Sequence, residues 1–410
     1  MKHLIAYPEI LYADGGYYDG EVPIEACFVL NNLDQPPVAF FDHVFDSAIC
    51  NRSSYSFFGS SDDFKQELSA NYEFIRKEFS VSPACVAYSI KNCYVFKNVI
   101  YRSALEGLDV IHETYRNNDR PWTEALPFDA PPPPASRRFE SVDGNCIYMG
   151  SVGSSNYGHW LVDDLARLKF LADKKGSYTL VLTAMGEAID RIRSQSIDLM
   201  LGHLKGGELK YEIVYTQPSD VLHFEDLIYI TPVSFHPFVK HPSAENFVRA
   251  NILSALSNPG SGEARLFVKR SQSRYRKLIN IEEIEAILEA NGFTAIDPEQ
   301  FDFQTQVKKF AEASIVVGIM GAAMTNTIFC APGTEVIYLA PDRWMEPFYW
   351  DLAGVMGHRY STVFGDLSGA HDMPYFDDFS IAEDDLRAAL NQLGEIGSGL
   401  SMRPRFTTAT

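Results

Sequence analysis

The sequence has a low content of positive charge for its size. Its 410 residues include 35 Lys and Arg against 54 Asp and Glu, which gives a formal net charge of −19 at pH 7. A surface with this balance repels polyanions, so broad binding of nucleic acid or of an anionic membrane is excluded. Any local cluster of basic residues is therefore a candidate site for one particular anion.

Long hydrophobic runs are missing as well. No segment approaches the roughly 18 uninterrupted apolar residues of a membrane-spanning helix. The start, MKHLIAYPEILYADGG, has too short an apolar run for a signal peptide. We expect a cytoplasmic protein, with peripheral association at the inner face of the membrane left open.

Metal and disulfide motifs are also absent from the sequence. Its histidines form no HExxH or HxH pattern, and His236 and His241 lie in a proline-rich loop where we expect no metal. We predict no metal and no cofactor. The cysteines show no CxxC or zinc spacing and are expected to be reduced thiols. They are Cys27, Cys50, Cys85, Cys93, Cys146 and Cys330.

The composition itself is that of a large globular protein. With 46% hydrophobic and 13% aromatic residues, the chain can form two or three domains with substantial cores. The first 125 residues or so predict short strands and loops. Four consecutive prolines at 131–134 indicate a linker or surface loop. The following segment, FESVDGNCIYMG (139–150), predicts a hairpin around Asp143 and Gly144.

Helix and strand patterns alternate from about residue 150 onward. This alternation is typical of βαβ units with parallel sheets, and it divides the chain into two α/β halves with a cleft between them. Ligands of such sheets bind beyond the carboxyl ends of the strands. Asn280 and Glu283 predict a capping box at one helix start. The expected helices are 157–173, 187–204, 281–292, 303–313 and one that starts near 321, and the expected strands are 178–184, 211–216, 224–232, 264–270, 293–297, 313–318 and 334–341.

A basic segment, VKRSQSRYRKLIN (268–280), follows one predicted strand directly. Arg270, Arg276 and Lys277 are among its five cationic residues. Because the guanidinium fork matches phosphate oxygens bidentately, the segment can act as a diphosphate clamp. The alternative is a solvated loop that is positively charged by chance.

A second motif, ASIVVGIMGAAMTN (313–326), is an apolar strand followed by a turn of small residues and a helix start. Unpaired N–H groups and the partial positive charge at a helix N-terminus favour a phosphate there. Thr325 and Asn326 add hydrogen-bonding side chains. The match of Gly318 and Gly321 to GxGxxG is weak, and close packing of strand on helix without a ligand is the alternative.

The third motif is GSVGSSNYGHWLVDDLARLKFL (150–171). His159, Asp163 and Arg167 share one stripe of the expected helix. Leucines lie on the opposite side, which predicts an amphipathic helix, and Asp164 lies off the stripe. A His and a carboxylate in the first turns can share a proton, as a general base requires. The alternative is a polar face that only contacts water.

Taken in this order, the three motifs resemble the pattern of glycosyltransferase family 61, the DUF563 group. NYGHWLVDDLARL (156–168) is similar to the signature NYxHWLxExLxRL. The basic loop after a strand follows, and FQTQVKKFAEASIVVGIMGAAMTN (303–326) is similar to a Gln-containing helix, a strand and a GxHGAxxTN turn. Met320 stands where the family has histidine, and a thioether cannot donate a hydrogen bond. The resemblance covers about 150–341.

This resemblance implies an α/β fold of the GT-B type, in which two Rossmann-like domains face each other across a cleft. An acceptor-side domain would span 1–250, with a β-rich, aromatic region to about 140. A nucleotide-sugar-binding domain would span 251–378. A C-terminal helix and a loose tail, 379–410, would follow, and that helix can return to the N-terminal domain.

The implied function is that of an inverting, metal-independent hexosyl- or pentosyltransferase. It would move a sugar from a nucleotide sugar, with a UDP-sugar as first choice, to a hydroxyl of a glycan or lipid-linked glycan in bacterial capsular, exo- or lipopolysaccharide synthesis. The family pattern assigns the base to Asp163, with His159 as its support or substitute. Carried over onto this sequence, the donor-binding positions are Arg270, Arg276, Lys277, Gly321, Ala322, Thr325 and Asn326.

Three other functions stay open at this point. Two Rossmann-like halves also suit an NAD(P)-dependent oxidoreductase, although the missing GxGxxG and the basic loop argue against it. Met320 suits a non-catalytic nucleotide-sugar-binding protein. An epimerase of the GT-B type would isomerise the donor without an acceptor.

Overall fold

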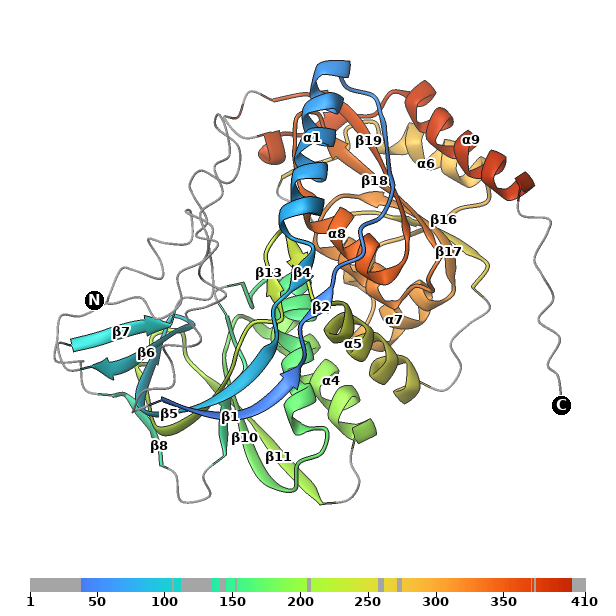
Figure 1. The fold of residues 1–410 in the computed structure, drawn as a ribbon. Helices are drawn as coiled ribbons and strands as arrows, with labels where there is room; N and C mark the ends of the chain where they lie inside the picture. Colours follow the sequence, from blue (N-terminus) through green and yellow to red (C-terminus); the bar gives the residue numbers. More distant parts are fainter. Residues whose placement is uncertain are drawn as a thin grey trace, which may run out of the picture.

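The structure is a computed structural model with two α/β halves, each built on one large sheet (Figure 1). It describes residues 38–104, 107–111, 135–140, 145–151, 153–204, 208–256, 262–270, 275–369, 371 and 374–399. Cys27, the prolines at 131–134, the turn at Asp143 and the residues after 399 lie outside this description. The two α/β halves predicted from the sequence are therefore confirmed.

The N-terminal sheet has nine strands in a mixed arrangement. Its order is β11-β10-β9-β12-β5-β6-β7, with β1 paired to β5 and β8 paired to β12. β9 to β12 run parallel, whereas β5 to β7 form an antiparallel extension. The strands are β1 (Val38–Phe45), β5 (Cys85–Phe96), β6 (Val99–Ala104), β7 (Gly107–Ile111), β8 (Arg137–Phe139), β9 (Cys146–Tyr148), β10 (Gly176–Thr183), β11 (Leu209–Thr216) and β12 (Leu222–Ile230).

The hairpin predicted over 139–150 is wrong. Strands β8 and β9 do not pair with each other, because both pair with β12, and both run parallel to it. β8 is aligned with Leu222–Phe224, and β9 is aligned with Leu227 and Ile228. An Asp-Gly pair between two β-rich runs indicates a turn, but the turn does not determine which strand each run will pair with.

The segment between β9 and β10 is helical, but its helix type changes twice. It begins as α3 (Tyr157–His159), continues as the π-helical η4 (Trp160–Asp164) and ends as the 3₁₀-helical η5 (Leu165–Leu171). The predicted amphipathic helix is wrong in one respect. Asp163 and Arg167 of the predicted polar stripe are buried, as are Asp164 and the leucines. The segment contacts α4 (Glu187–Leu204), α5 (Pro242–Ala255) and the C-terminal half, so little of it faces water.

The C-terminal sheet is parallel except for its last strand. Its order is β16-β15-β17-β18-β19-β20, and β3 pairs with β19. The chain moves from β15 to one side and then returns past it to the other, so the strand order reverses between β15 and β17. The strands are β3 (Tyr55–Phe58), β15 (Ala264–Val268), β16 (Thr294–Ile296), β17 (Ala313–Ile319), β18 (Glu335–Pro341), β19 (Arg359–Leu367) and β20 (Phe379–Ser380).

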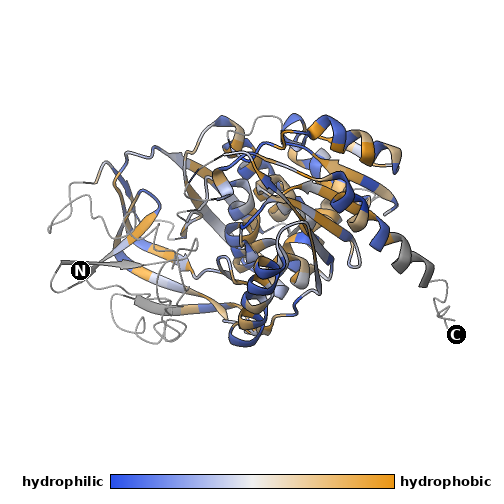
Figure 2. Cartoon of the chain, turned by 90° about the horizontal axis from the view of Figure 1, so that it is seen from above, coloured by the Kyte–Doolittle hydropathy of each residue, from blue (hydrophilic) through white to orange (hydrophobic). Residues whose placement is uncertain are grey.

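Helices cover both faces of this C-terminal sheet, because alternate strand residues point to opposite faces. Val317 and Ile337 pack with α6 (Ile281–Ala290) and α9 (Glu383–Gly399). Their neighbours Val316 and Val336 belong to a second core with α7 (Phe303–Ala311) and α8 (Pro347–Met356). Figure 2 shows the hydrophobic residues gathered along the strands and the helix sides that face them. The 3₁₀ helices are η6 (Pro298–Gln300), η7 (Ala322–Phe329) and η8 (Pro374–Phe376).

The expected domain boundaries need two corrections. β3 and α1 (Asp62–Glu78) precede residue 250, yet they pack on the C-terminal sheet beside β19 (Figure 1). The last helix, α9, stays with β19 and β3 rather than returning to the N-terminal half. In addition, Asn280 does not cap α6 with its side chain, because its amide oxygen accepts the N–H of Ile381.

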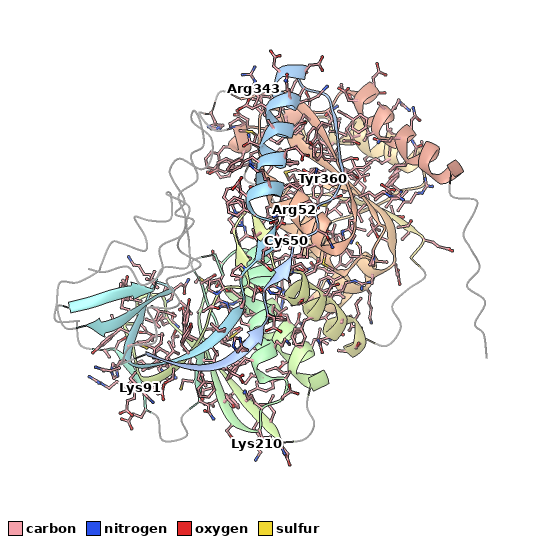
Figure 3. All side chains as sticks on the ribbon, in the orientation of Figure 1. Cys50, Arg52, Lys91, Lys210, Arg343 and Tyr360 are labelled. Carbon is pink, nitrogen blue, oxygen red and sulfur yellow. The ribbon has the colours of Figure 1, made fainter. Side chains whose placement is uncertain are left out.

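The two halves share buried contacts. One hydrophobic core runs through both, and Arg52, labelled between the halves in Figure 3, pairs with Asp351. Lys240 lies on the short pair β13 (Ser234–Phe235) and β14 (Val239–Lys240), and it reaches the same carboxylate at 3.2 Å. A second short pair is β2 (Ala48–Ile49) with β4 (Val81–Ser82). Among the described helices, none has the length and apolar character needed to cross a membrane.

Candidate active site

The site lies where the strand order of the C-terminal sheet reverses, which is where open α/β sheets bind their ligands. Arg270 follows β15, and Gly321 follows β17. The guanidinium of Arg270 covers Gly321 so closely that a Cβ atom there would lie 2.9 Å from its Cζ. Arg270 also donates to the carbonyl of Met320 at 3.5 Å. The basic loop and the small-residue turn therefore meet, as the sequence predicted.

A cavity of about 200 Å³ opens beside this turn, and both halves line it. This volume is on the scale of a single sugar ring. The N-terminal half contributes Asn156, Gly158, His159 and His236, and the C-terminal half contributes Arg276, Gly321, Ala322, Thr325, Trp344, Glu346, Phe348, Tyr349 and Tyr375.

Small residues before the helical segment let it approach the C-terminal half. A Cβ atom on Gly158 would lie 2.7 Å from the hydroxyl oxygen of Thr325, and one on Gly153 would lie 2.9 Å from the ring of His159. Asn156 caps the segment by accepting the N–H of Gly158 at 2.8 Å. These contacts place His159 at the wall of the cavity.

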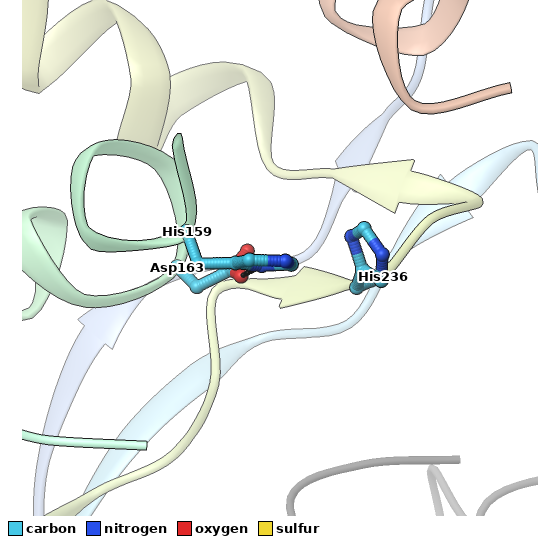
Figure 4. A group of neighbouring side chains, drawn as sticks. All are labelled: His159, Asp163 and His236. Atoms are coloured by element: carbon cyan, nitrogen blue, oxygen red, sulfur yellow. Dashed lines mark hydrogen bonds and ion pairs between the residues drawn. The ribbon is translucent and has the colours of Figure 1, made fainter. Parts of the chain in front are cut away.

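His159 and Asp163 form a hydrogen-bonded pair. The Nδ1 atom of His159 lies 2.6 Å from Oδ2 of Asp163. Figure 4 shows the two side chains leaving the same helical segment and extending toward His236. His159 lines the cavity, whereas Asp163 lies behind it. The carboxylate fixes the ring through Nδ1, which leaves Nε2 to face a ligand.

Asp163 is held as a buried carboxylate. Burial acts to raise its pKa, but hydrogen bonds from His159 and Ser234 and the charge of Lys240 outweigh this effect and lower it below the usual value. The hydroxyl of Ser234 donates to Oδ1, so both carboxylate oxygens have a partner. Lys240 is itself buried, which lowers its pKa to about 7.

Asp164 has a different environment from its neighbour. Its Oδ2 accepts the hydroxyl of Ser154 at 2.6 Å, and its Oδ1 lies 3.7 Å from Nη2 of Arg167. Burial raises the pKa of Asp164. Arg167 also donates from Nε to the main-chain oxygen of Asp163. The carboxylate that its guanidinium approaches is that of Asp164, and not that of Asp163 as the predicted stripe suggested.

The basic residues Arg270, Arg276 and Lys277 differ in their exposure and in their contact with the cavity. Arg276 lines the cavity and lies over the ring of Trp344, at 4.5 Å from its centroid. Arg270 is partly buried, and desolvation followed by the charge of Arg276 lowers its pKa to about 10, so it stays protonated at neutral pH. Lys277 is exposed and lies outside the cavity lining.

The predicted residues of the small-residue turn also differ in where they point. Gly321, Ala322 and Thr325 line the cavity. The side chain of Asn326 instead bridges the two halves: it donates to Gln306 at 3.0 Å and accepts the hydroxyl of Tyr157. Met320 is 1% exposed and belongs to the hydrophobic core, so its thioether is not part of the cavity wall.

Several lining residues were not predicted from the sequence. His236 comes from the loop between β13 and β14, and its ring lies 4.4 Å from that of His159 (Figure 4). The ligand atoms of His159, Asp163 and His236 all lie within 4.8 Å of one another, so these three residues could hold a metal ion. RWMEPFYW (343–350) supplies four more lining residues. Its position just after a predicted parallel strand was a usable signal.

Comparison with known proteins identifies the central part of the chain. Residues 157–337 match the family Glycosyltransferase 61. The glycosyltransferase 61 domain begins two residues before His159 and ends within β18, so it contains the His159–Asp163 pair, the basic loop and the turn at Gly321. The resemblance seen in the sequence is confirmed over this range. The central part of the chain is therefore similar to glycosyltransferase family 61.

Other comparisons add little to this result. No curated protein matches the chain. Among solved structures, the dodecameric iron-containing heptosyltransferase TibC in complex with ADP-D-β-D-heptose matches with 11% sequence identity and a TM-score of 0.31. The match covers 65% of this chain and 79% of that one.

Proposed function

We propose that this protein is an inverting glycosyltransferase of the GT-B type, which moves a sugar from a nucleotide sugar to an acceptor hydroxyl. The observation that carries the proposal is the single cavity between an imidazole–carboxylate pair and a cationic turn. His159 and Asp163 lie on the N-terminal side, and Arg270, Arg276 and Gly321 lie on the C-terminal side.

His159 is the better candidate for the base, in place of the Asp163 assignment from the sequence. It contacts the cavity, and its Nδ1 is engaged by the carboxylate. In the proposed step, Nε2 takes the proton of the acceptor hydroxyl as that oxygen bonds to the anomeric carbon. Asp163 then acts as a positioning residue, because it orients the ring and stabilises the imidazolium.

The bond from the anomeric carbon to the nucleoside diphosphate breaks in the same step, and the electron pair leaves with the phosphate oxygen. Attack from the opposite side inverts the anomeric configuration. Arg270 and Arg276 are positioned to stabilise the charge that develops on the diphosphate. The first N–H groups of η7 carry a partial positive charge, which would stabilise the diphosphate as well.

The finer assignments are also proposals. We propose a UDP-sugar as donor, a glycan or lipid-linked glycan as acceptor, and a role in capsular, exo- or lipopolysaccharide synthesis at the cytoplasmic face of the membrane. Lys277 would help at the entrance, since it is exposed. The two arginines supply the charge that a metal provides in other transferases, so we propose that the transfer needs no metal.

A screen of nucleotide sugars tests this function. Incubation with a panel of donors and glycan acceptors should give a glycosylated product and nucleoside diphosphate, and the reaction should persist in EDTA. NMR of the product should show the anomeric configuration opposite to that of the donor. Donor isomerisation without acceptor would indicate an epimerase, binding of NAD(P)H would indicate an oxidoreductase, and binding without turnover would indicate a scaffold.

A further inference from the structure

His236 adds a third ligand group to the His159–Asp163 pair, and the proposed transfer step does not use it. His236 comes from a different element than the pair, 73 residues after Asp163 by sequence number. The three residues bring two imidazoles and one carboxylate together, with ligand atoms within 4.8 Å of one another. Two of the three side chains line the cavity.

Two imidazoles and one carboxylate are a ligand set for a late first-row metal rather than for magnesium. Imidazole nitrogen suits zinc, whereas Mg²⁺ takes oxygen ligands and keeps several waters. The hydroxyl of Ser234 holds Oδ1 of Asp163, and carboxylates around metals are commonly fixed by such a hydrogen bond. The cavity gives an ion an entry path and room for a water ligand.

Binding would need only a modest contraction of the cluster. Ligand atoms about 2.1 Å from a zinc ion lie roughly 3 to 3.6 Å apart. The ligand atoms now lie within 4.8 Å of one another, so the longest distance between them has to shorten by about 1 Å. His159 and Asp163 are already 2.6 Å apart, so zinc would replace the proton between them and this pair would open slightly. The closing movement is then that of His236, which lies in the short loop between Phe235 and Val239 and packs against the rings of His159 and Phe348.

We propose that His159, Asp163 and His236 bind a zinc ion that blocks the catalytic base. This regulatory role rests on the proposed function, because it assumes that His159 accepts the acceptor proton. A coordinated imidazole has no lone pair left for that proton. Zinc therefore inhibits an enzyme whose transfer step itself needs no metal, and a chelator restores activity.

Zinc titration of the tag-free full chain tests the site without any sugar substrate. Isothermal titration calorimetry should show one Zn²⁺ per chain and no comparable binding of Mg²⁺. His236→Asn and Asp163→Asn should each weaken zinc binding by at least about tenfold. His43→Asn is the matched control, because His43 is exposed on β1, away from the cavity, and its loss should leave the affinity unchanged.

The outcomes separate the two proposals. Equal zinc binding by wild type and His236→Asn, with both variants shown to be folded by circular dichroism, would overturn the metal site. Loss of binding in His236→Asn but not in His43→Asn supports it, whether or not transfer is ever detected. In a working transfer assay, zinc should inhibit and EDTA should reverse the inhibition, and activity that zinc leaves unchanged or increases would overturn the blocking role.

Discussion

Asp163 and Asp164 are adjacent in the sequence, yet their surroundings give them different properties. Asp163 keeps its charge because His159, Ser234 and Lys240 outweigh its burial. Asp164 is buried beside Ser154 and Arg167, and its pKa rises. One carboxylate therefore faces an imidazole that reaches the cavity, and the other stabilises the turn before the helix. Consecutive residues of a helical segment point in different directions, which is why the two carboxylates have different neighbours.

Replacing either member of the His159–Asp163 pair should lower turnover. His159→Ala should lower kcat by about 10² to 10⁴, since it removes the group that takes the proton. Asp163→Asn should also lower kcat, because the imidazole loses the carboxylate that fixes its orientation. Steady-state kinetics measure both effects.

Asp164→Asn is the control for these two variants. It should reduce stability but leave kcat of the folded protein nearly unchanged, because the side-chain partners of Asp164 are Ser154 and Arg167. If His159→Ala retained near-normal turnover while Asp163→Asn lost it, Asp163 itself would be the base.

The two neighbouring cations Lys269 and Arg270 allow a matched test of the diphosphate site. Arg270 covers the turn at Gly321, whereas Lys269 points to Glu285 on α6 at 2.9 Å. Arg270→Ala should weaken UDP binding by about tenfold to a hundredfold, as expected for a lost charge-assisted hydrogen bond. Lys269→Ala should change it less than about twofold. Calorimetric titration with UDP measures both.

If Lys269→Ala and Arg270→Ala weakened UDP binding equally, the loop would attract the diphosphate by its overall positive charge rather than bind it through Arg270. Lys277→Ala should have a smaller effect than Arg270→Ala, because the Lys277 side chain is exposed and does not line the cavity. The effect of Arg270→Ala should also persist better at high salt, because Arg270 is partly buried and packs on Gly321.

At the scale of elements, the close approach of α3 to η7 assembles the cavity. Gly158 faces Thr325, and Tyr157 donates to Asn326 one residue further along η7. A main-chain atom of one half therefore lies directly on a side chain of the other. The run of small residues before His159 is explained by this packing, and its role does not require flexibility.

Gly158→Ala should separate the two elements. Its Cβ atom would meet the hydroxyl oxygen of Thr325 at 2.7 Å, so we expect a loss of about 1 to 3 kcal/mol in the free energy of unfolding. Gly202→Ala is the matched control, because a Cβ atom there meets nothing within 4 Å. Gly202 lies in the last turn of α4, where alanine should stabilise by up to about 0.5 to 1 kcal/mol. Urea denaturation measures both.

The double variant Gly158→Ala with Thr325→Ala completes this test. It removes the clashing hydroxyl, so it should recover part of the lost stability. A Gly158→Ala protein that is as stable as Gly202→Ala would show that the two elements can move apart at no cost, and the packing argument would then fail.

At the scale of the whole molecule, the N-terminal part of the chain contributes segments to the C-terminal half. β3 and α1 from the N-terminal part of the chain complete the C-terminal sheet, and Lys240 reaches Asp351 across the junction. One hydrophobic core includes residues of both sheets. Neither half is therefore a separate unit in sequence or in packing.

The shared segments and the common hydrophobic core predict a single thermal unfolding transition. Calorimetry should show one cooperative peak, because unfolding one half exposes core residues of the other. UDP at 100 times its Kd should stabilise the whole molecule by about 2.7 kcal/mol and keep the single peak. Two transitions, of which UDP shifts only one, would contradict this and would indicate independent domains.

Local sequence patterns predicted the elements that depend on local forces. Hydrophobic periodicity and turn residues predicted the helix at 187–204 and seven strands, and the structure has an element at each place. The seven predicted strands are 178–184, 211–216, 224–232, 264–270, 293–297, 313–318 and 334–341. The hairpin at 139–150 failed, because a turn signal does not specify the partner of a strand. The amphipathic helix failed because burial of its polar side depends on what packs against it.

By itself, the sequence determined the order of the predicted elements and the chemistry of three motifs, because both depend on residues close together in the chain. The tertiary structure alone decided which of those groups meet. Ser234 reaches Asp163 across 71 residues, and Tyr157 reaches Asn326 across 169. It also decided that His159 rather than Asp163 faces the cavity, and that His236 joins them. Contacts at such separations depend on how whole sheets pack, which no local pattern encodes.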